Sequence, residues 1–261
     1  MTDQRRTTRS GPAAVLLVLA KTPVPGRVKT RLTPPCTPEQ AADIAAAALL
    51  DTLVAVRTVV DQQESSGTRT VPVLALEGRL ADVPDARRRD ALRRATDGMV
   101  LLAQRGSGLP ERIVVAHADA AASCRGARVL QIGMDTPQVT PELLAGGLTA
   151  LAGIERGAVL APAQDGGWWA LGVTDPALAR PVLDVPTSRA DTYVRTRAAL
   201  EQAGTACVLL PMLTDVDTWP VAVEVAALRP ESAFAEAVGQ VVTDSGGPPT
   251  AACAPWLSAT G

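Results

Sequence analysis

Short apolar runs alternate along the chain with longer segments of mixed polarity, and this alternation predicts strands and helices in turn. The runs that predict strands span 15–20, 71–76, 98–102, 127–133, 158–162, an extended continuation to residue 173, and 206–210. The segments that predict helices span 41–60, 85–96, 111–123, 140–153, 188–203 and 219–228. Because strands alternate with helices, the pattern indicates an α/β fold with a mostly parallel sheet covered on both faces.

The two ends of the chain lack this pattern. Residues 1–12 are polar and basic, and residues 241–261 are rich in Gly, Pro, Ala and Ser, so we expect a disordered N-terminal arm and a loose C-terminal tail. Residues 13–240 between them have the length of a single domain. The first apolar run and the arginines before it also imitate a secretory signal peptide. Cleavage of such a peptide would remove the first predicted strand. No stretch approaches the roughly 18 apolar residues that a membrane span needs.

Composition narrows the classes of function. Of the 261 residues, 47% are hydrophobic and 20% are charged, and the net charge is -2 at pH 7, which argues against a general nucleic-acid binder.

The four cysteines, at positions 36, 124, 207 and 253, form no Cys-x-x-Cys pair, so we expect neither zinc nor a disulfide, and the expected location is the cytoplasm. The only histidine, His117, has no neighbouring nucleophile, which favours a structural or surface role. The arginines within 87–94 are interpreted as a solvated helix face.

A loop rich in cations follows the first predicted strand. It displays four basic side chains on backbone shaped by Pro23, Pro25 and Gly26; these are Lys21, Arg27, Lys29 and Arg31. In an open α/β sheet this loop lies at the carboxyl end of a strand, where such folds bind ligands, and phosphate is the anion that best fits. The sequence has neither a P-loop nor a G-x-G-x-x-G motif here. The alternative is a surface loop with ordinary solvated charges.

Three aspartates occupy similar positions at the ends of other predicted strands. Asp135 comes directly after an apolar run, and Asp165 and Asp217 occupy similar positions where a strand passes into a turn, so we expect them on the same edge of the sheet as the cationic loop. Carboxylates beside Lys and Arg are suited to holding Mg²⁺ or Mn²⁺ together with a nucleotide. Each aspartate alone could instead be a turn or cap residue, and this alternative stays open for Asp215 and Thr218.

The Asp165-Gly166-Gly167 sequence predicts a tight turn. Its bare backbone would let a ligand approach closely. Trp168 and Trp169, which follow the turn, either form a pocket wall or pack in the core.

Four motifs, in order, resemble one known family. They are Ala20-Lys21-x-Pro23-x-Pro25-Gly26-x-Val28-Lys29-Thr30-Arg31-Leu32, Gly133-x-Asp135-x-Pro137, Ala163-x-Asp165-Gly166-Gly167-Trp168 and Asp215-Val216-Asp217-Thr218. They look like the signatures of the radical-SAM/selenodomain-associated transferase 1 family (DUF2064), which is similar to 2-phospho-lactate guanylyltransferase. The resemblance implies a glycosyltransferase-A-like (nucleotide-diphospho-sugar transferase) three-layer sandwich with a mostly parallel sheet. It also implies that the segment 29–32 holds triphosphate and that Asp135 and Asp217 hold the metal.

Three positions depart from the family pattern. The chain has Trp168 where the family usually has Tyr, and Pro186-Thr187-Ser188 where the family has a Trp-Ser pair. The segment 106–112 lacks the acid of the family's Gly-Asp-Leu-Gly-Glu-Arg element. These differences lie on the side that the resemblance assigns to the acceptor.

The residues and the resemblance together predict a metal-dependent transferase. In the main hypothesis, a nucleoside triphosphate transfers its nucleotidyl group to a small acceptor, which is phosphorylated or otherwise carries an attacking oxygen, and pyrophosphate leaves. The alternatives are a glycosyltransferase with a nucleotide-sugar donor and a nucleotide-binding module without turnover. The predicted catalytic residues are Lys29, Arg31 and Asp165, and the predicted metal ligands are Asp135 and Asp217, with Mg²⁺ or Mn²⁺ as the ion. The predicted nucleotide-binding residues are Lys21, Pro25, Gly26, Lys29, Thr30, Arg31, Gly133, Gly166 and Gly167.

Overall fold

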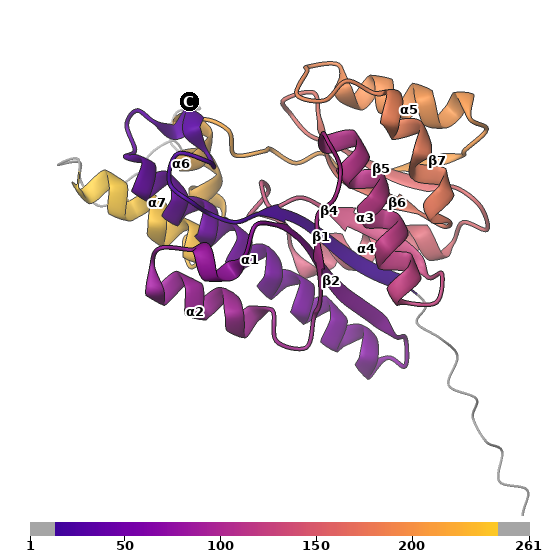
Figure 1. Cartoon of the computed structure of the whole chain (residues 1–261), viewed down its shortest axis with the longest axis horizontal. Helices are drawn as coiled ribbons and strands as arrows, with labels where there is room; N and C mark the ends of the chain where they lie inside the picture. Colours follow the sequence, from indigo (N-terminus) through magenta and orange to yellow (C-terminus); the bar gives the residue numbers. More distant parts are fainter. Residues whose placement is uncertain (1–13, 245–261) are drawn as a thin grey trace, which may run out of the picture.

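A seven-stranded sheet forms the centre of the protein in the computed structural model, which describes residues 14–244 (Figure 1). The strands are β1 (Ala14–Lys21), β2 (Thr70–Glu77), β3 (Val100–Ala103), β4 (Arg128–Ile132), β5 (Ala158–Pro162), β6 (Trp168–Val173) and β7 (Cys207–Leu209). Their order across the sheet is β3-β2-β1-β4-β6-β5-β7. Only β6 runs antiparallel to its neighbours, β4 and β5. The predicted α/β fold with a mostly parallel sheet is therefore confirmed.

The order of the strands reverses direction between β1 and β4. From β1, the chain adds β2 and β3 on one side and β4 on the other. In open α/β sheets, such a reversal leaves a crevice at the carboxyl ends of the two strands, because the connecting segments diverge there. The cationic loop follows β1 and Asp135 follows β4, so both candidate elements border this point.

Helices cover both faces of the sheet (Figure 1). One face packs on α1 (Pro38–Ser65), α2 (Ala86–Ala95) and α4 (Pro141–Ala152), and the alternate side chains of β1 on this face include Leu16 and Val18. The other face packs on α3 (Leu109–Ser123), the 3-10 segment η3 (Pro176–Asp184) and α5 (Thr192–Gln202), with Leu17 and Leu19. This gives three layers, as the resemblance implied.

A third apolar cluster joins the first half of α1 to α6 (Trp219–Leu228) and α7 (Ala233–Asp244). Phe234 is buried at its centre. Asp51 of α1 accepts hydrogen bonds from the backbone N–H groups of Ala233 and Phe234, at 3.1 and 2.8 Å. Because the first N–H groups of a helix lack partners within it, Asp51 caps α7 from a different helix.

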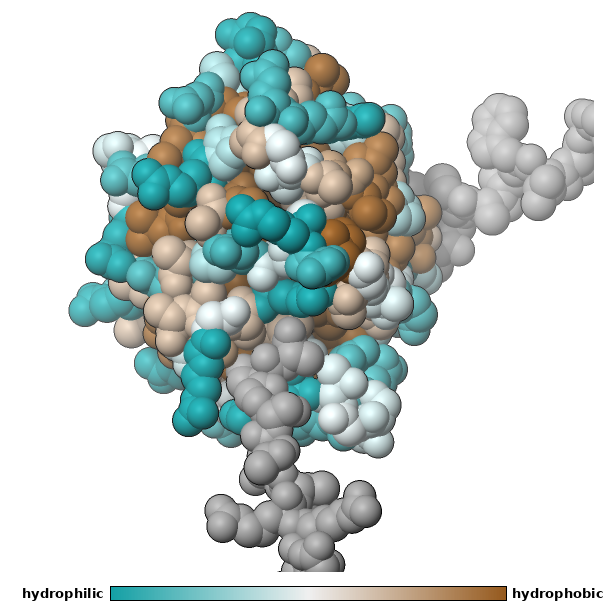
Figure 2. Space-filling view, turned by 90° about the vertical axis from the view of Figure 1, so that its right-hand side faces the viewer, coloured by the Kyte–Doolittle hydropathy of each residue, from teal (hydrophilic) through white to brown (hydrophobic). Residues whose placement is uncertain are grey.

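The short 3-10 elements complete the path of the chain. They are η1 (Thr30–Leu32), which ends the cationic loop, and η2 (Leu80–Asp82), which follows β2. Figure 2 shows the side of the molecule that lies to the right in Figure 1, and hydrophobic and hydrophilic residues are interspersed on it. Within residues 14–244, no helix is both long and apolar enough to cross a membrane.

Several expectations differ from the structure. Helix α7 was not predicted; it continues to Asp244, so the folded part extends beyond the expected domain end at 240. Arg88 was expected on a solvated face, but it is 7% exposed and bonds both carboxylate oxygens of Asp43, at 2.8 and 3.1 Å. For His117 a structural or surface role was expected; the side chain is fully buried and bonds Gln131 at 3.1 Å, which excludes the surface alternative. The arm 1–12, residues 245–261 of the tail and the fourth cysteine lie outside the described residues.

Candidate functional site

The motif around Asp135 and the motif around Asp217 meet at the carboxyl end of the sheet. Asp135 follows β4, and the segment of Asp217 follows β7. The backbone N–H of Val216 donates to the carbonyl oxygen of Asp135 at 2.9 Å, which fixes the two segments side by side. Two stretches that are about eighty residues apart in the chain therefore present their carboxylates to the same space.

Lys29 reaches this space from the cationic loop. Its ammonium forms a close ion pair with Asp135, lies 3.7 Å from Oδ1 of Asp217 and donates to the carbonyl oxygen of Val216 at 2.5 Å. The Lys29 side chain is only 6% exposed, whereas those of Asp135 and Asp217 are 48% and 40% exposed. The backbone of Lys29 is left-handed, with φ 48° and ψ 35°, a conformation that costs free energy for a residue with a Cβ.

Arg31 supports the same pair from the solvent side. Its guanidinium Nη1 donates to Oδ2 of Asp217 at 3.1 Å, and its side chain is 71% exposed. Thr30, between the two cations, is exposed. The predicted Lys29-Thr30-Arg31 segment thus borders the predicted metal ligands, but its two cations are directed at carboxylates.

Asp215 adds a further carboxylate that the sequence left undecided. Burial is the largest cause of a rise in its pKa from 3.8 to about 7. Three neighbouring carboxylates add to this rise and Lys29 opposes it; the carboxylates are those of Asp135, Asp165 and Asp217. Oδ1 of Asp215 is buried and has no hydrogen-bond partner in the described part of the chain. Asp135, Asp165, Asp215 and Asp217 are called the carboxylate cluster below.

The Asp165-Gly166-Gly167 turn has the predicted tight geometry, but another part of the chain fills the space beside Gly166. Oδ1 of Asp165 accepts from the N–H of Gly167 at 2.8 Å. Gly166 has φ +90°, and a Cβ there would lie 2.0 Å from the carbonyl oxygen of Ala190. The chain after η3 therefore crosses directly over this glycine, and a ligand has no space on that side. Asp165 itself is exposed.

Gly133 and Gly26 have free space around them. A Cβ on Gly133 would meet only the backbone N of Asp135, at 3.9 Å, and one on Gly26 would meet nothing within 4 Å. Gly26 has φ +74° and, with Pro25, forms the tip of the cationic loop. A ligand can therefore approach the backbone at both predicted glycines.

Both tryptophans pack against neighbouring segments. Trp169 is 3% exposed and donates from its indole N–H to the carbonyl oxygen of Pro211 at 2.9 Å. Trp168, which is partly buried, donates to the hydroxyl of Thr196 at 3.2 Å. Of the two alternatives for this pair, Trp169 takes the core role.

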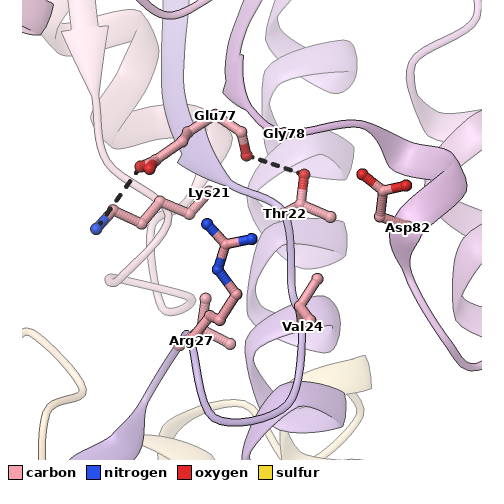
Figure 3. Close-up of a pocket in the computed structure, with 8 residues that line it drawn as sticks. Lys21, Thr22, Val24, Arg27, Glu77, Gly78 and Asp82 are labelled. Atoms are coloured by element: carbon pink, nitrogen blue, oxygen red, sulfur yellow. Dashed lines mark hydrogen bonds and ion pairs between the residues drawn. The ribbon is translucent and has the colours of Figure 1, made fainter. Parts of the chain in front are cut away.

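Lys21 and Arg27 lie in a separate pocket of about 320 Å³. Figure 3 shows it between the cationic loop and the chain that follows β2, with the guanidinium of Arg27 directed toward Lys21 and Thr22. Lys21 lies 3.7 Å from a carboxylate oxygen of Glu77. Thr22 donates to the backbone carbonyl oxygen of Glu77 from both N–H and hydroxyl, each at 2.9 Å. The four cations of the loop thus form two pairs at one edge of the sheet, rather than one group.

The pocket and the carboxylate cluster border each other. The N–H of Lys21 contacts Sδ of Met134 at 3.3 Å, and Met134 precedes Asp135. The sequence reasoning missed Glu77 and Asp82 as pocket residues. A signal for Glu77 was present, because it directly follows the apolar run 71–76 and so ends a predicted strand.

The carboxylate cluster has the chemistry of a divalent-metal site but not the open arrangement. Its hard oxygen atoms suit Mg²⁺ or Mn²⁺, and Oδ1 of Asp215 lacks a partner. Within residues 14–244, however, no three acidic, His or Cys side chains are placed to hold an ion together. Asp135 and Asp217 instead surround the ammonium of Lys29, so the oxygens fit a metal only once this lysine moves.

Known structures share this fold. A protein from Desulfovibrio desulfuricans G20, provisionally described as a nucleotide-diphospho-sugar transferase, is 23% identical with a TM-score of 0.68, over 89% of this chain and 98% of that chain. A cytidylyltransferase from Leptospira borgpetersenii serovar Hardjo-bovis is 10% identical with a TM-score of 0.50, over 90% of this chain and 95% of that chain. At these identities the likeness shows the glycosyltransferase-A-like fold, which was expected.

The sequence also matches a described family. A comparison with curated proteins gave no match. The family described as "Uncharacterized protein conserved in bacteria (DUF2064)" matches residues 68–189, which contain the Asp135 and Asp165 motifs, while the first and last motifs lie outside this range. The family resemblance that the motifs predicted is thereby confirmed: across residues 68–189, this chain matches the DUF2064 family.

Proposed function

We propose that this protein is a metal-dependent transferase with a nucleotide donor, and that it transfers the nucleotidyl group of a nucleoside triphosphate to a small acceptor. The observation that carries the proposal is the meeting of Lys29 with Asp135 and Asp217 at the point where the strand order reverses. Phosphate-binding cations and metal-binding oxygens are thus available together at the edge where α/β folds bind ligands.

Asp135 and Asp217 would hold Mg²⁺ or Mn²⁺, and Asp215 is a third candidate ligand because its Oδ1 is unpartnered. The ion supplies positive charge that neutralises the phosphate oxygens. Lys29 and Arg31 add cationic charge beside it. Lys21 and Arg27 line the neighbouring pocket and are placed to bind another part of the same nucleotide.

The proposed reaction needs little proton transfer from the protein. An acceptor oxygen attacks the α-phosphorus, the bond to the bridging oxygen of the β-phosphate breaks, and pyrophosphate leaves with the electron pair. An acceptor that is already anionic needs no general base, which agrees with the full burial of His117. Catalysis would then depend on positioning and on the cations that stabilise the leaving phosphates.

Glycosyl transfer from a nucleotide-sugar is the second candidate. The exposed carboxylate of Asp165 favours it, because this group belongs to the carboxylate cluster and could accept the proton of an acceptor hydroxyl. The description of the Desulfovibrio protein points in the same direction. A nucleotide-binding module without turnover is the third candidate. The departures from the family pattern at Trp168 and at residues 186–188 favour it.

Thermal unfolding with a panel of ligands tests the proposal. Nucleoside triphosphates and nucleotide-sugars, each with and without Mg²⁺ or Mn²⁺, are compared for the wild type, Asp135→Asn and the control Asp61→Asn, which is exposed near the end of α1. A ligand at about a hundred times its dissociation constant adds roughly 2.7 kcal/mol, or several degrees. We expect a metal-dependent shift with a triphosphate in the wild type and Asp61→Asn, but not in Asp135→Asn.

Other results of this experiment would support other functions. A shift confined to nucleotide-sugars would replace nucleotidyl transfer by glycosyl transfer. A shift that survives Asp135→Asn and chelation would refute the metal assignment in both enzyme hypotheses. Binding without any release of pyrophosphate or sugar transfer would favour the binding module.

A further inference from the structure

Lys29 lies between the two carboxylates that would hold the metal, and we propose that it excludes the metal until a nucleotide binds. The inference rests on the proposed function, because it assigns an order of binding to metal and nucleotide at the same site. It gives Lys29 two successive sets of partners: the carboxylates in the free protein, and phosphate in the complex.

In the free protein, oxygen atoms of the protein surround the ammonium of Lys29. It forms a close ion pair with Asp135, donates to the carbonyl oxygen of Val216 at 2.5 Å and lies 3.7 Å from Oδ1 of Asp217. Because only 6% of the side chain is exposed, water has little access to replace these partners. The ammonium therefore already acts as the cation of this carboxylate pair.

A divalent ion cannot join this arrangement without displacing the lysine. An ion bound to both Asp135 and Asp217 would lie against the ammonium, and like charges at contact repel strongly in a partly buried place. The absence of a ready-made group of three metal-ligating side chains within residues 14–244 agrees with this view. Metal alone should consequently bind weakly.

A nucleotide offers the lysine a replacement partner. Within residues 14–244, the polar contacts of Lys29 Nζ are with Asp135, Val216 and Asp217 and not with its own loop, so the ammonium can leave the carboxylates if another anion is near. The phosphates of a nucleotide are such an anion, and their arrival would free both carboxylates for the metal. Metal and nucleotide then bind cooperatively, and each raises the affinity of the other by the same factor.

The test measures Mn²⁺ binding by calorimetry and by electron paramagnetic resonance, with and without a non-hydrolysable nucleoside triphosphate analogue. The wild type is compared with Lys29→Met, Lys29→Arg and Lys21→Met. For Mn²⁺ alone, without the analogue, Lys21→Met is the matched control, because Lys21 is the only other lysine in the chain and pairs with Glu77 outside the carboxylate cluster. Circular dichroism and thermal unfolding establish that each variant is folded.

We expect the analogue to tighten Mn²⁺ binding to the wild type by about 5- to 150-fold, the usual range of coupling between sites. Lys29→Met should bind Mn²⁺ alone several-fold more tightly than the wild type. Lys29→Arg, which keeps the charge, and Lys21→Met should bind Mn²⁺ alone like the wild type.

Two results would overturn the inference while leaving the proposed function intact. One is wild-type protein that binds Mn²⁺ equally well with and without the analogue, a result that holds even if Lys29→Met does not fold. The other is folded Lys29→Met with unchanged affinity for Mn²⁺ alone. If Mn²⁺ binds under neither condition, the metal site of the proposed function fails together with this inference.

Discussion

Replacement of Asp215 by Asn should remove a pH-dependent loss of stability from the metal-free protein. Burial and the neighbouring carboxylates raise the pKa of Asp215 from 3.8 to about 7. A carboxyl group with a higher pKa in the folded state than in the unfolded state binds protons more readily when folded. Its contribution to stability is therefore present at low pH and is lost as the pH rises from about 4 to about 7.

The size of this loss follows from the two pKa values. The difference between 3.8 and about 7 is about three pH units, and each unit corresponds to about 1.36 kcal/mol, so the loss reaches about 4 kcal/mol. Asparagine does not titrate, so the Asp215→Asn variant does not undergo this loss of stability. Relative to Asp215→Asn, the wild type should lose up to about 4 kcal/mol of unfolding free energy between about pH 4 and about pH 8.

Urea denaturation of both proteins across this pH range, with a chelator present, measures the difference directly. Asp61→Asn serves as the control, because it changes an exposed carboxyl group far from the cluster. A difference between the wild type and Asp215→Asn that stays constant with pH would refute the reasoning, because Asp215 would then titrate alike in the folded and unfolded states.

Two further substitutions test the structure outside the carboxylates. Burial lowers the pKa of His117 from 6.5 to about 4, so the wild type should lose about 3 kcal/mol relative to His117→Leu as the pH falls from about 6.5 to about 4; equal pH dependence in urea denaturation would contradict this. Gly166→Ala should cost about 1–3 kcal/mol, because its Cβ would strike the carbonyl oxygen of Ala190. Gly67→Ala, which also has a positive φ but free space, should cost less in the same assay, and equal losses would contradict the predicted clash.

The elements of the fold could be predicted from the sequence because burial repeats regularly along it. The strand β1 contains no polar side chain before Lys21, and α1 begins at a capping box whose two members, Thr37 and Gln40, are only three residues apart in the sequence. Helix α7 was missed because its partners are distant: Asp51 caps it, and Phe234 packs against α1. Neither contact leaves a local signal.

The sequence predicted that Asp135 and the cationic loop lie at one edge of the sheet, where the structure has them, but it did not define the contacts among their side chains. Strand ends alone placed Asp135 and the cationic loop together, because parallel strands share a carboxyl edge. The division of the cations depends on side-chain directions: Lys29 turns toward Asp135, whereas Lys21 turns toward Glu77. The contact of Gly166 with Ala190 likewise depends on the path of a loop that no periodic pattern describes.

Anomalous diffraction from crystals grown with Mn²⁺ and a non-hydrolysable nucleoside triphosphate analogue would test the central claim most directly. The account predicts one manganese peak bound by Asp135 and Asp217, with phosphate beside Lys29 and the nucleoside toward the pocket of Lys21 and Arg27. A manganese peak elsewhere, or a nucleotide bound away from this edge of the sheet with Lys29 still paired to Asp135, would contradict it.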